Sequence, residues 1–300
     1  MRYTLRQLEV FLATARFENV SRAAQLLSMS QSAASGALAE LEAQFDVQLF
    51  ERHGKRLRLS ELGHQVRAQA QSVLDQAQAL QDGLVQGEEV GALRLGATLT
   101  IGNYLAVPMI AQFRQLYPNA NVRLSVANTQ TVADAVANYD LDVGLVEGEL
   151  NRAELKVQRW RQDELVVFTA PGHLLANLKR VDDEQLMSQQ WIVRESGSGT
   201  RQTFDRAMHG ILPLLDISME LQHTEAIKRA VESQLGVGCL SRISLADAFD
   251  RGSLVPVSVP QRDFSRQLNI ITHREKYHSV ALTQWLECCF KKWSVVQEAN

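Results

Sequence analysis

Hydrophobic positions in the first 45 residues recur every three or four places, as they do along one face of an α-helix. They predict a helix around residues 5–12, a second over 22–27 capped by Ser21, and a third over about 31–45. A short helix, a tight turn and a longer helix are typical of the helix-turn-helix. The expected apolar faces comprise Leu5, Leu8, Val10, Phe11, Leu12, Ala23, Ala24, Leu27, Ala34, Leu38, Leu41 and Phe45.

Short polar side chains open the third predicted helix, and a basic hairpin follows it. Side chains of this kind at the start of a helix can reach base edges in a major groove. Residues 51–59 form two extended pieces around Gly54, and their cations would meet phosphates beside that helix. The alternative is an ordinary helical subdomain with a solvated charge run. The predicted DNA contacts are Ser30, Gln31, Ser32, Ser35, Arg52, Lys55 and Arg56.

A long amphipathic helix is predicted next, capped by Ser60 and running to about Gln86. At about 1.5 Å per residue it is roughly 40 Å long, too long to bury its apolar side against a sixty-residue domain. Pairing with the same helix of a second copy of the chain would bury that apolar side. The alternative is packing on the second domain of the same chain. Gly91 marks the boundary. The heptad positions are Leu62, Val66, Ala70, Val73, Ala77, Leu80 and Leu84.

Strand-like and helix-like runs alternate from residue 93 onward, which predicts an α/β domain with a parallel sheet. We expect two lobes, the first from residues 91–162 and 267–300 and the second from 163–266, with a ligand cleft where their strands end. The strands are predicted at 93–97, 122–127, 141–146, 165–169, 191–193, 217–221, 237–240 and 268–272, and the helices at 104–117, 131–138, after 200, at 225–233 and at 280–293.

Hydroxyls and glycines stand where a strand turns into a helix in both predicted lobes. Thr98 and Thr100 follow the first strand, and the stretch RESGSGTR follows the strand of Trp191. Free N–H groups and a helix amino terminus bind anions, so a small anionic effector is expected. Simple helix capping by the serines is the alternative. The loop lacks the lysine of the GxxxxGK[ST] motif, so nucleotide hydrolysis is not expected. The loop's candidates are Ser196, Gly197, Ser198, Gly199 and Thr200.

Three charged residues near the predicted cleft refine the expected ligand. Glu147 ends the third strand, and a carboxylate beside a bound anion favours a ligand that carries an O–H. A partly protonated inorganic oxyanion or a hydroxylated phospho-metabolite meets that requirement. Arg194 and Arg201 are expected either to add countercharge or to be solvated.

Composition restricts the class of protein further. The 300 residues are 45% hydrophobic and 22% charged with six prolines, as in soluble globular proteins of two or more domains. The amino terminus is not a signal peptide and no 18-residue apolar run occurs, so a cytoplasmic protein without a membrane partner is expected. Three cysteines form neither a disulfide framework nor a metal motif. Residues 1–60 hold eight Lys and Arg against six Asp and Glu, which indicates a polyanionic partner for an otherwise acidic chain.

Residues 5–63, from "LRQLEVFLATARFENVSRAAQLLSMSQSAASGALAELEAQFDVQLFERHGKRLRLSELG", closely resemble the amino-terminal domain of LysR-type transcriptional regulators. The resemblance implies a winged helix-turn-helix, a periplasmic-binding-protein-like effector domain and a homotetramer on double-stranded promoter DNA. RNA polymerase is a further candidate partner. "ATLTIGNYLAVPMI", "DVGLVEG", "DELVVFTAP" and "TEAIKRAVESQLGVGCLSR" look most like the branch of Calvin-cycle activators and sulfur-metabolism regulators, some of them sulfite-responsive.

The expected function is therefore a DNA-binding regulator that is not an enzyme, needs no cofactor and responds to a small anion. One alternative is a helix-turn-helix fused to a biotin-ligase-like enzyme, but such an enzyme needs a GRGRxG-type loop with a catalytic lysine nearby, and GSGT lacks both. HExxH and GxSxG motifs are also absent, and the seven histidines have no ligand-like spacing. The other alternative is a DNA-binding oligomer whose second domain needs no ligand.

Overall fold

The computed structural model describes residues 2–53, 56–86 and 91–292. These residues form two compact units. The DNA-binding unit comprises the chain up to Gly91 together with Arg274–Thr283, and the effector unit comprises Ala92–His273 together with the chain from Gln284 onward. Within the described ranges, no helix combines the length and the apolar character that a bilayer span requires.

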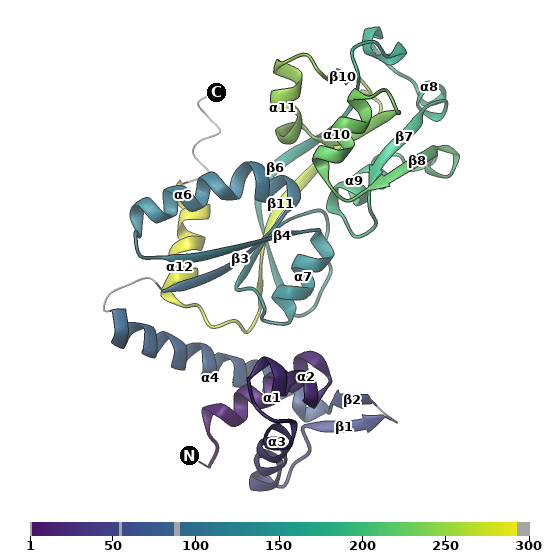
Figure 1. Cartoon of the computed structure of the whole chain (residues 1–300). Helices are drawn as coiled ribbons and strands as arrows, with labels where there is room; N and C mark the ends of the chain where they lie inside the picture. The colour runs from purple at the N-terminus through teal and green to yellow at the C-terminus, as the bar shows by residue number, and fades with distance from the viewer. Residues whose placement is uncertain (1, 54–55, 87–90, 293–300) are drawn as a thin grey trace. The chain divides into compact units, whose positions relative to one another are not determined.

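The DNA-binding unit consists of three helices, a hairpin and a long helix (Figure 1). Polar caps fix the helix starts, and Thr4, Asn19 and Ser30 each accept an N–H from the first turn that follows. The second helix therefore begins at Val20 under Asn19, and not after Ser21 as predicted. The elements are α1 (Leu5–Phe17), α2 (Val20–Leu26), α3 (Gln31–Phe45), β1 (Phe50–His53), β2 (Arg56–Leu59) and α4 (Glu61–Gln86).

The core of the DNA-binding unit contains most of the predicted apolar positions. Leu8, Phe11 and Leu38 are buried in it. The prediction was wrong for Leu5 and Phe45, which are 47% and 46% exposed. They are the first residue of α1 and the last of α3, where a helix reaches past the partner it packs on.

The long helix α4 begins as predicted, with the Ser60 hydroxyl accepting the Gly63 N–H at 3.0 Å. Its heptad positions divide into two halves. Val66, Ala70 and Val73 pack against the core of their own unit, whereas Leu80 and Leu84 are 66% and 80% exposed. The second half of the seam is therefore the part open to a partner helix.

Nine strands build the sheet of the effector unit in the order β4-β3-β5-β11-β6-β9-β7-β8, with β10 paired to β6. The predicted parallel pairing is confirmed for β4-β3-β5 and for β9-β7-β8. It was wrong for the centre, where β6 and β11 run antiparallel to each other and to their neighbours. The strands are β3 (Ala92–Thr98), β4 (Asn121–Ala127), β5 (Val143–Glu147), β6 (Leu155–Thr169), β7 (Gln190–Arg194), β8 (Asp216–Leu221), β9 (Val237–Ser241), β10 (Val255–Val257) and β11 (Ser265–His273).

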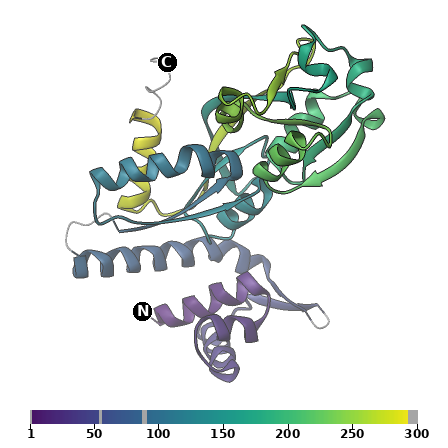
Figure 2. The ribbon, with the colours of Figure 1, turned by 45° about the horizontal axis from the view of Figure 1, so that its top comes forward.

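The long strands β6 and β11, here called the crossing strands, join two lobes (Figures 1 and 2). Lobe I holds β3–β5, and lobe II holds β7–β10. Three elements of lobe II, α8, α11 and β10, and the first half of β6 had no counterpart in the prediction. The helical segments are α5 (Leu99–Ile101), η1 (Gly102–Ala106), α6 (Val107–Leu116), α7 (Thr129–Ala137), η2 (Leu174–Asn177), α8 (Asp183–Met187), α9 (Gly199–Ala207), η3 (Leu212–Leu214), α10 (Thr224–Glu232), α11 (Arg242–Asp250), α12 (Val280–Glu287) and η4 (Cys288–Lys292).

Lobe II owes its stability to side chains on both faces of its sheet. Trp191 and Val193 on β7 point to the α9 face, where the Trp191 and Phe204 ring centroids are 5.1 Å apart. Ile192 points to the opposite face and packs with Ile227 of α10. This alternation is the strand pattern that two covered faces require.

Truncating Phe204 to alanine removes a fully buried ring and should lower the free energy of unfolding of the effector unit by about 3–5 kcal/mol. The Leu174→Ala control removes a side chain that is 85% exposed, so a change within about 0.5 kcal/mol is expected. Urea unfolding of the full chain, followed by tryptophan fluorescence, measures both. Equal midpoints for the two variants contradict this packing.

Candidate DNA-binding surface and effector cleft

The start of α3 presents three of the predicted DNA contacts to solvent. Gln31, Ser32 and Ser35 are exposed, whereas Ala34 of the same turns is buried. Ser30 is exposed as well, and its hydroxyl accepts the Ala33 N–H at 3.1 Å and thereby caps the helix. Open space above Gly36 leaves room for another backbone to approach.

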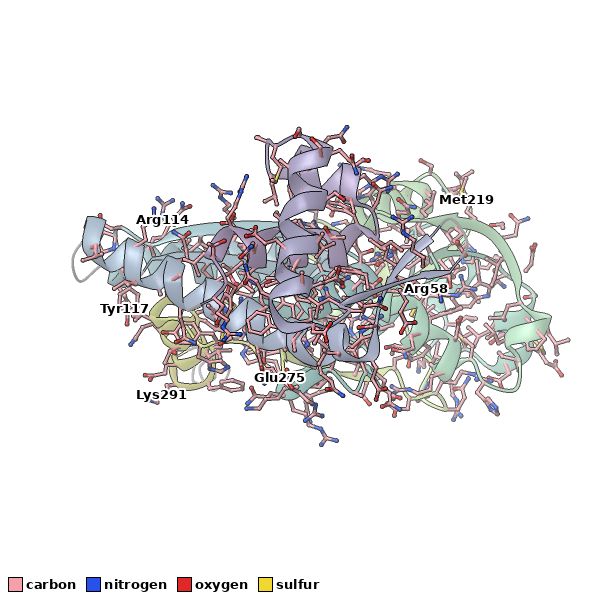
Figure 3. The ribbon with its side chains drawn as sticks, turned by 90° about the horizontal axis from the view of Figure 1, so that it is seen from below. Arg58, Arg114, Tyr117, Met219, Glu275 and Lys291 are labelled. Atoms are coloured by element: carbon pink, nitrogen blue, oxygen red, sulfur yellow. The ribbon has the colours of Figure 1, made fainter. Side chains whose placement is uncertain are left out.

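The predicted wing is a two-stranded antiparallel hairpin. Leu57 and Leu59 of β2 pack against the core, while Arg52 on β1 is exposed. Arg58 on β2, labelled in Figure 3, is exposed as well. Lys55 lies outside the described residues, and so does the side chain of Arg56. Arg52 is paired with Leu57 and Arg58 with Glu51, so the two arginines lie on opposite faces of the hairpin, and their contact with phosphates stays a prediction.

Two hydroxyls begin helices on the facing lobes of the effector unit. Thr98 ends β3 and precedes α5, and Ser198 precedes α9. Both occupy the N-cap position, yet neither side chain makes a cap hydrogen bond. Their Oγ atoms are buried without a partner among the described residues. Ser198 therefore does not have the simple capping role that was the alternative.

The GSGT loop of lobe II packs directly on lobe I. The Gly199 N–H donates to Thr129 Oγ1 at 3.1 Å, and the Gln130 N–H donates to the Gly197 carbonyl at 3.2 Å. A Cβ on Gly199 would lie 2.1 Å from the carbonyl oxygen of Glu147. Both glycines therefore serve the contact between the lobes, and Gly197 also needs its φ of 86°.

Parallel pairing brings the predicted lobe I residues to one edge of the sheet. Ala97 lies opposite Leu145, so Thr98 and Glu147 stand where β3 and β5 end. Thr100, in the first turn of α5, is also buried. Ser196, in the loop of lobe II, is exposed. The structure thus brings the lobe I residues to one edge of the sheet, and a ligand cleft there stays a prediction.

Glu147 is part of a buried ionic cluster that the sequence did not reveal. Its Oε2 lies 2.5 Å from Arg266 Nη2, which also lies 2.7 Å from Asp163 Oδ2, and all three side chains are 1% exposed. Arg266 Nη1 also donates to Thr200 Oγ1 at 2.9 Å. One guanidinium faces two carboxylates, so the ionised cluster keeps one negative charge.

Arg194 and Arg201 carry less free charge than expected. Arg194 donates twice to Glu195, at 2.8 and 3.0 Å, and its Nη1 is buried without a hydrogen-bond partner in the described structure. Arg201 binds Asp205 and Glu220, at 2.8 and 2.9 Å. Both guanidiniums are therefore paired with carboxylates of the protein, and Arg194, which is 1% exposed, is not solvated; a countercharge to a ligand stays a prediction.

Thr224 is a candidate that sequence reasoning missed. It opens α10 after β8, in the same strand, hydroxyl and helix order as Thr98 and Ser198, and its Oγ1 is buried and lacks a partner among the described residues. That order was a usable signal. Asp163 and Arg266 lie too far apart in the sequence for any local pattern to pair them.

Two cavities adjoin this region. A groove of about 1230 Å³ follows the crossing strands, with Asp163 and Arg266 in its wall. A smaller cavity of about 440 Å³ lies between α7 and α9 and is lined by Ser196–Gly199 and Arg201. Neither includes Thr98, Thr100, Glu147, Arg194 or Thr200, because these side chains are almost completely enclosed. No group of three His, Cys, Asp or Glu side chains in the described ranges could hold a metal ion.

Comparisons with known proteins agree with both units. Residues 5–64 match the model of the bacterial regulatory helix-turn-helix protein, lysR family, and residues 86–294 match the LysR substrate binding domain. The chain is 43% identical over 289 residues to the HTH-type transcriptional regulator YeiE of Escherichia coli (strain K12), covering 96% of this chain and 98% of YeiE. It is 31% identical over 285 residues to the RuBisCO operon transcriptional regulator of Allochromatium vinosum, covering 94% and 93%.

A solved structure adds a ligand-bound effector domain to the comparison. The regulatory domain of CcmR from Synechocystis PCC6803, in complex with 2-PG, has a TM-score of 0.61 and 27% identity. The match covers 66% of this chain and 95% of that domain. The relatives are named as transcriptional regulators and not as enzymes. The chain therefore belongs to the LysR family of bacterial helix-turn-helix transcriptional regulators.

Proposed function

We propose that this regulator responds to a compact oxyanion that carries an O–H and binds between the two lobes. One observation carries the proposal: Thr98, Ser198 and Thr224 each have a buried hydroxyl oxygen without a partner in the described structure, and each stands at a helix start. Buried polar groups are normally hydrogen-bonded, so three unpaired hydroxyls at facing helix starts favour a ligand.

The chemistry of these positions favours an anion. Helix amino termini present free N–H groups and a partial positive charge, and hydroxyls can donate to oxyanion oxygens. The lobes already contact each other through Thr129 and Gly199, so the enclosed space suits a compact ligand. An inorganic sulfur oxyanion such as sulfite and a small phospho-metabolite both fit this description, and the 2-PG bound by CcmR is a small ligand of a related domain.

The Glu147 cluster favours a protonated ligand. Glu147, Asp163 and Arg266 together keep one negative charge when ionised, and a fully deprotonated dianion beside them is repelled. A ligand O–H that donates to the cluster removes part of that repulsion. Thr200 Oγ1, 3.4 Å from Glu147 Oε1, connects the cluster to the hydroxyl loop.

Lobe closure on the effector would alter DNA binding through the oligomer. The exposed half of the α4 seam, Leu80 and Leu84, supports pairing of two chains. Pairing sets two helix-turn-helix domains on successive half-sites of promoter DNA. We extend this proposal to a tetramer, which the family resemblance implies, and to contact with RNA polymerase.

The anion should stabilise the folded chain, because a ligand that binds only the native state raises its stability. Thermal unfolding with sulfite, phosphate and 2-PG tests this. Thr98→Val and Ser198→Ala should each lower the affinity for the anion that stabilises the chain by roughly fivefold, because each removes about one hydrogen bond. Ser188→Ala, at an exposed serine, is the matched control.

A chain that none of these anions stabilises contradicts the proposed ligand class. In that case the ligand-independent DNA-binding oligomer becomes the better description of the second domain.

Replacing Glu147 with glutamine should reduce discrimination between sulfite, which is partly protonated near neutral pH, and sulfate, which is not. The wild-type chain should prefer sulfite, and the variant should bind the two with more similar affinities. Calorimetric titration at one pH and ionic strength measures the ratio. Equal heats from both anions in the wild-type chain would remove this role for Glu147.

The two parts of the DNA-binding surface should respond differently to substitution. Arg52→Ala should weaken binding to all sequences and lower the slope of log K against log salt by about 1, because one phosphate contact is lost. Gln31→Ala should instead relax base preference. Arg180→Ala, at an exposed arginine of lobe II, is the control. Binding to fragments selected from genomic DNA measures these effects, and an unchanged salt slope and preference contradict the proposed docking.

A further inference from the structure

A tyrosine, a glutamate and a lysine connect the lobes at the start of α10. Tyr104 belongs to η1 of lobe I, and its hydroxyl donates to Glu225 Oε1 of lobe II at 2.7 Å. Lys228 Nζ lies 2.6 Å from the same carboxylate oxygen and donates to the Tyr104 hydroxyl at 3.2 Å. We call these three residues the clasp.

The lysine of the clasp is an unusual charge for a protein interior. Its side chain is only 9% exposed, whereas that of Glu225 is 57% exposed. Lys228 also donates to the Ser244 carbonyl at 3.1 Å, which holds the ammonium within lobe II. A buried ammonium with an exposed carboxylate partner is a charge that another anion can take over, because the exposed partner regains its hydration when released.

The ionisation states of the clasp are well defined. Burial opposes the charge of Lys228, but hydrogen bonds to Glu225 and Tyr104 outweigh it and raise the pKa of the ammonium. Burial likewise opposes the charge of Glu225, and the bonds from Lys228 and Tyr104 lower the pKa of that carboxyl overall. Burial and the nearby carboxylate raise the pKa of Tyr104. At neutral pH the clasp is an ammonium, a carboxylate and a neutral phenol.

The clasp borders the hydroxyls of the cleft. Glu225 follows Thr224, whose Oγ1 is buried and has no partner among the described residues, and Lys228 is one helical turn further along α10. Tyr104 lies six residues after Thr98 in the same helical run. The clasp therefore joins the segments that carry two of the three unpartnered hydroxyls, one from each lobe.

We propose that Lys228 recognises the charge of the effector, and that an anion entering the cleft takes this ammonium over from Glu225. This inference rests on the proposed anion-binding function. The carboxylate partner of Lys228 is 57% exposed, against 1% for Asp163 beside Arg266, 12% for Glu195 beside Arg194, and 35% and 50% for Asp205 and Glu220 beside Arg201. Of these four cations, Lys228 therefore has the most exposed carboxylate partner, and it has only that one. Tyr104 keeps its contact with Lys228 after the exchange, and the lobes stay together.

Two substitutions in the full-length chain should change affinity in opposite directions. Lys228→Met removes the recognising charge and should weaken sulfite or phosphate binding about tenfold or more. Glu225→Gln retains an acceptor for Tyr104 but removes the competing charge, and should strengthen binding about threefold. A purely structural clasp predicts weaker binding in both variants. Calorimetric titration measures the affinities, and thermal unfolding without ligand confirms that each variant is folded.

The double variant Lys228→Met/Glu225→Gln sharpens this test. Glu225 acts only through Lys228, so the double variant should bind as weakly as Lys228→Met alone. Lys156→Met, at an exposed lysine of β6, controls for the loss of one positive charge and should bind as the wild type does. Wild-type affinity in Lys228→Met, or weaker binding in both single variants, overturns the clasp while leaving the anion site intact. A wild-type chain that binds none of the anions overturns both proposals.

Discussion

The contacts of the buried Arg266 guanidinium hold the two lobes of the effector unit together. It lies on a crossing strand and joins Glu147 of lobe I to Asp163 of the other crossing strand, and it also donates to Thr200 at the start of α9. Removing ions from water costs several kcal/mol each, and only their mutual contacts offset it. Loss of one partner leaves an unpaired buried charge, so the two lobes are held together at this junction by ionic contacts that must be kept.

This neutralisation inside the protein determines how the cleft can select a ligand. Arg194, Arg201 and Arg266 are already paired with carboxylates, so a ligand gains little from them. Under the proposed function, selection would then depend on the unpartnered hydroxyls, the helix amino termini and the Lys228 ammonium. Hydrogen-bond sites discriminate more strongly than apolar pockets, because a wrong ligand leaves buried polar groups unpaired. The proposal therefore predicts discrimination among similar small anions.

Local patterns in the sequence predicted the parts of the fold whose causes are local. Heptad spacing located α4, and the hydroxyls at strand-to-helix turns located Thr98 and Ser198. The sequence could not predict β6 as one 15-residue strand, because its first half is polar and exposed on one side. Nor could it pair Arg266 with Glu147, because that contact exists only after distant strands have become neighbours in the sheet. For the same reason the sequence could not show that Arg194 and Arg201 are paired with carboxylates of the protein.

The chain passes directly from the effector unit into the DNA-binding unit at the end of β11. Strand β11 carries Arg266 near its start and ends at His273, and residues 274–283 then group with α4. In that segment Lys276 Nζ lies 2.6 Å from Asp75 of α4, with only 4% of the lysine side chain exposed. Because breaking a buried ion pair leaves an uncompensated charge, this contact holds the segment on α4. The covalent link between the two units is therefore anchored at its DNA-binding end.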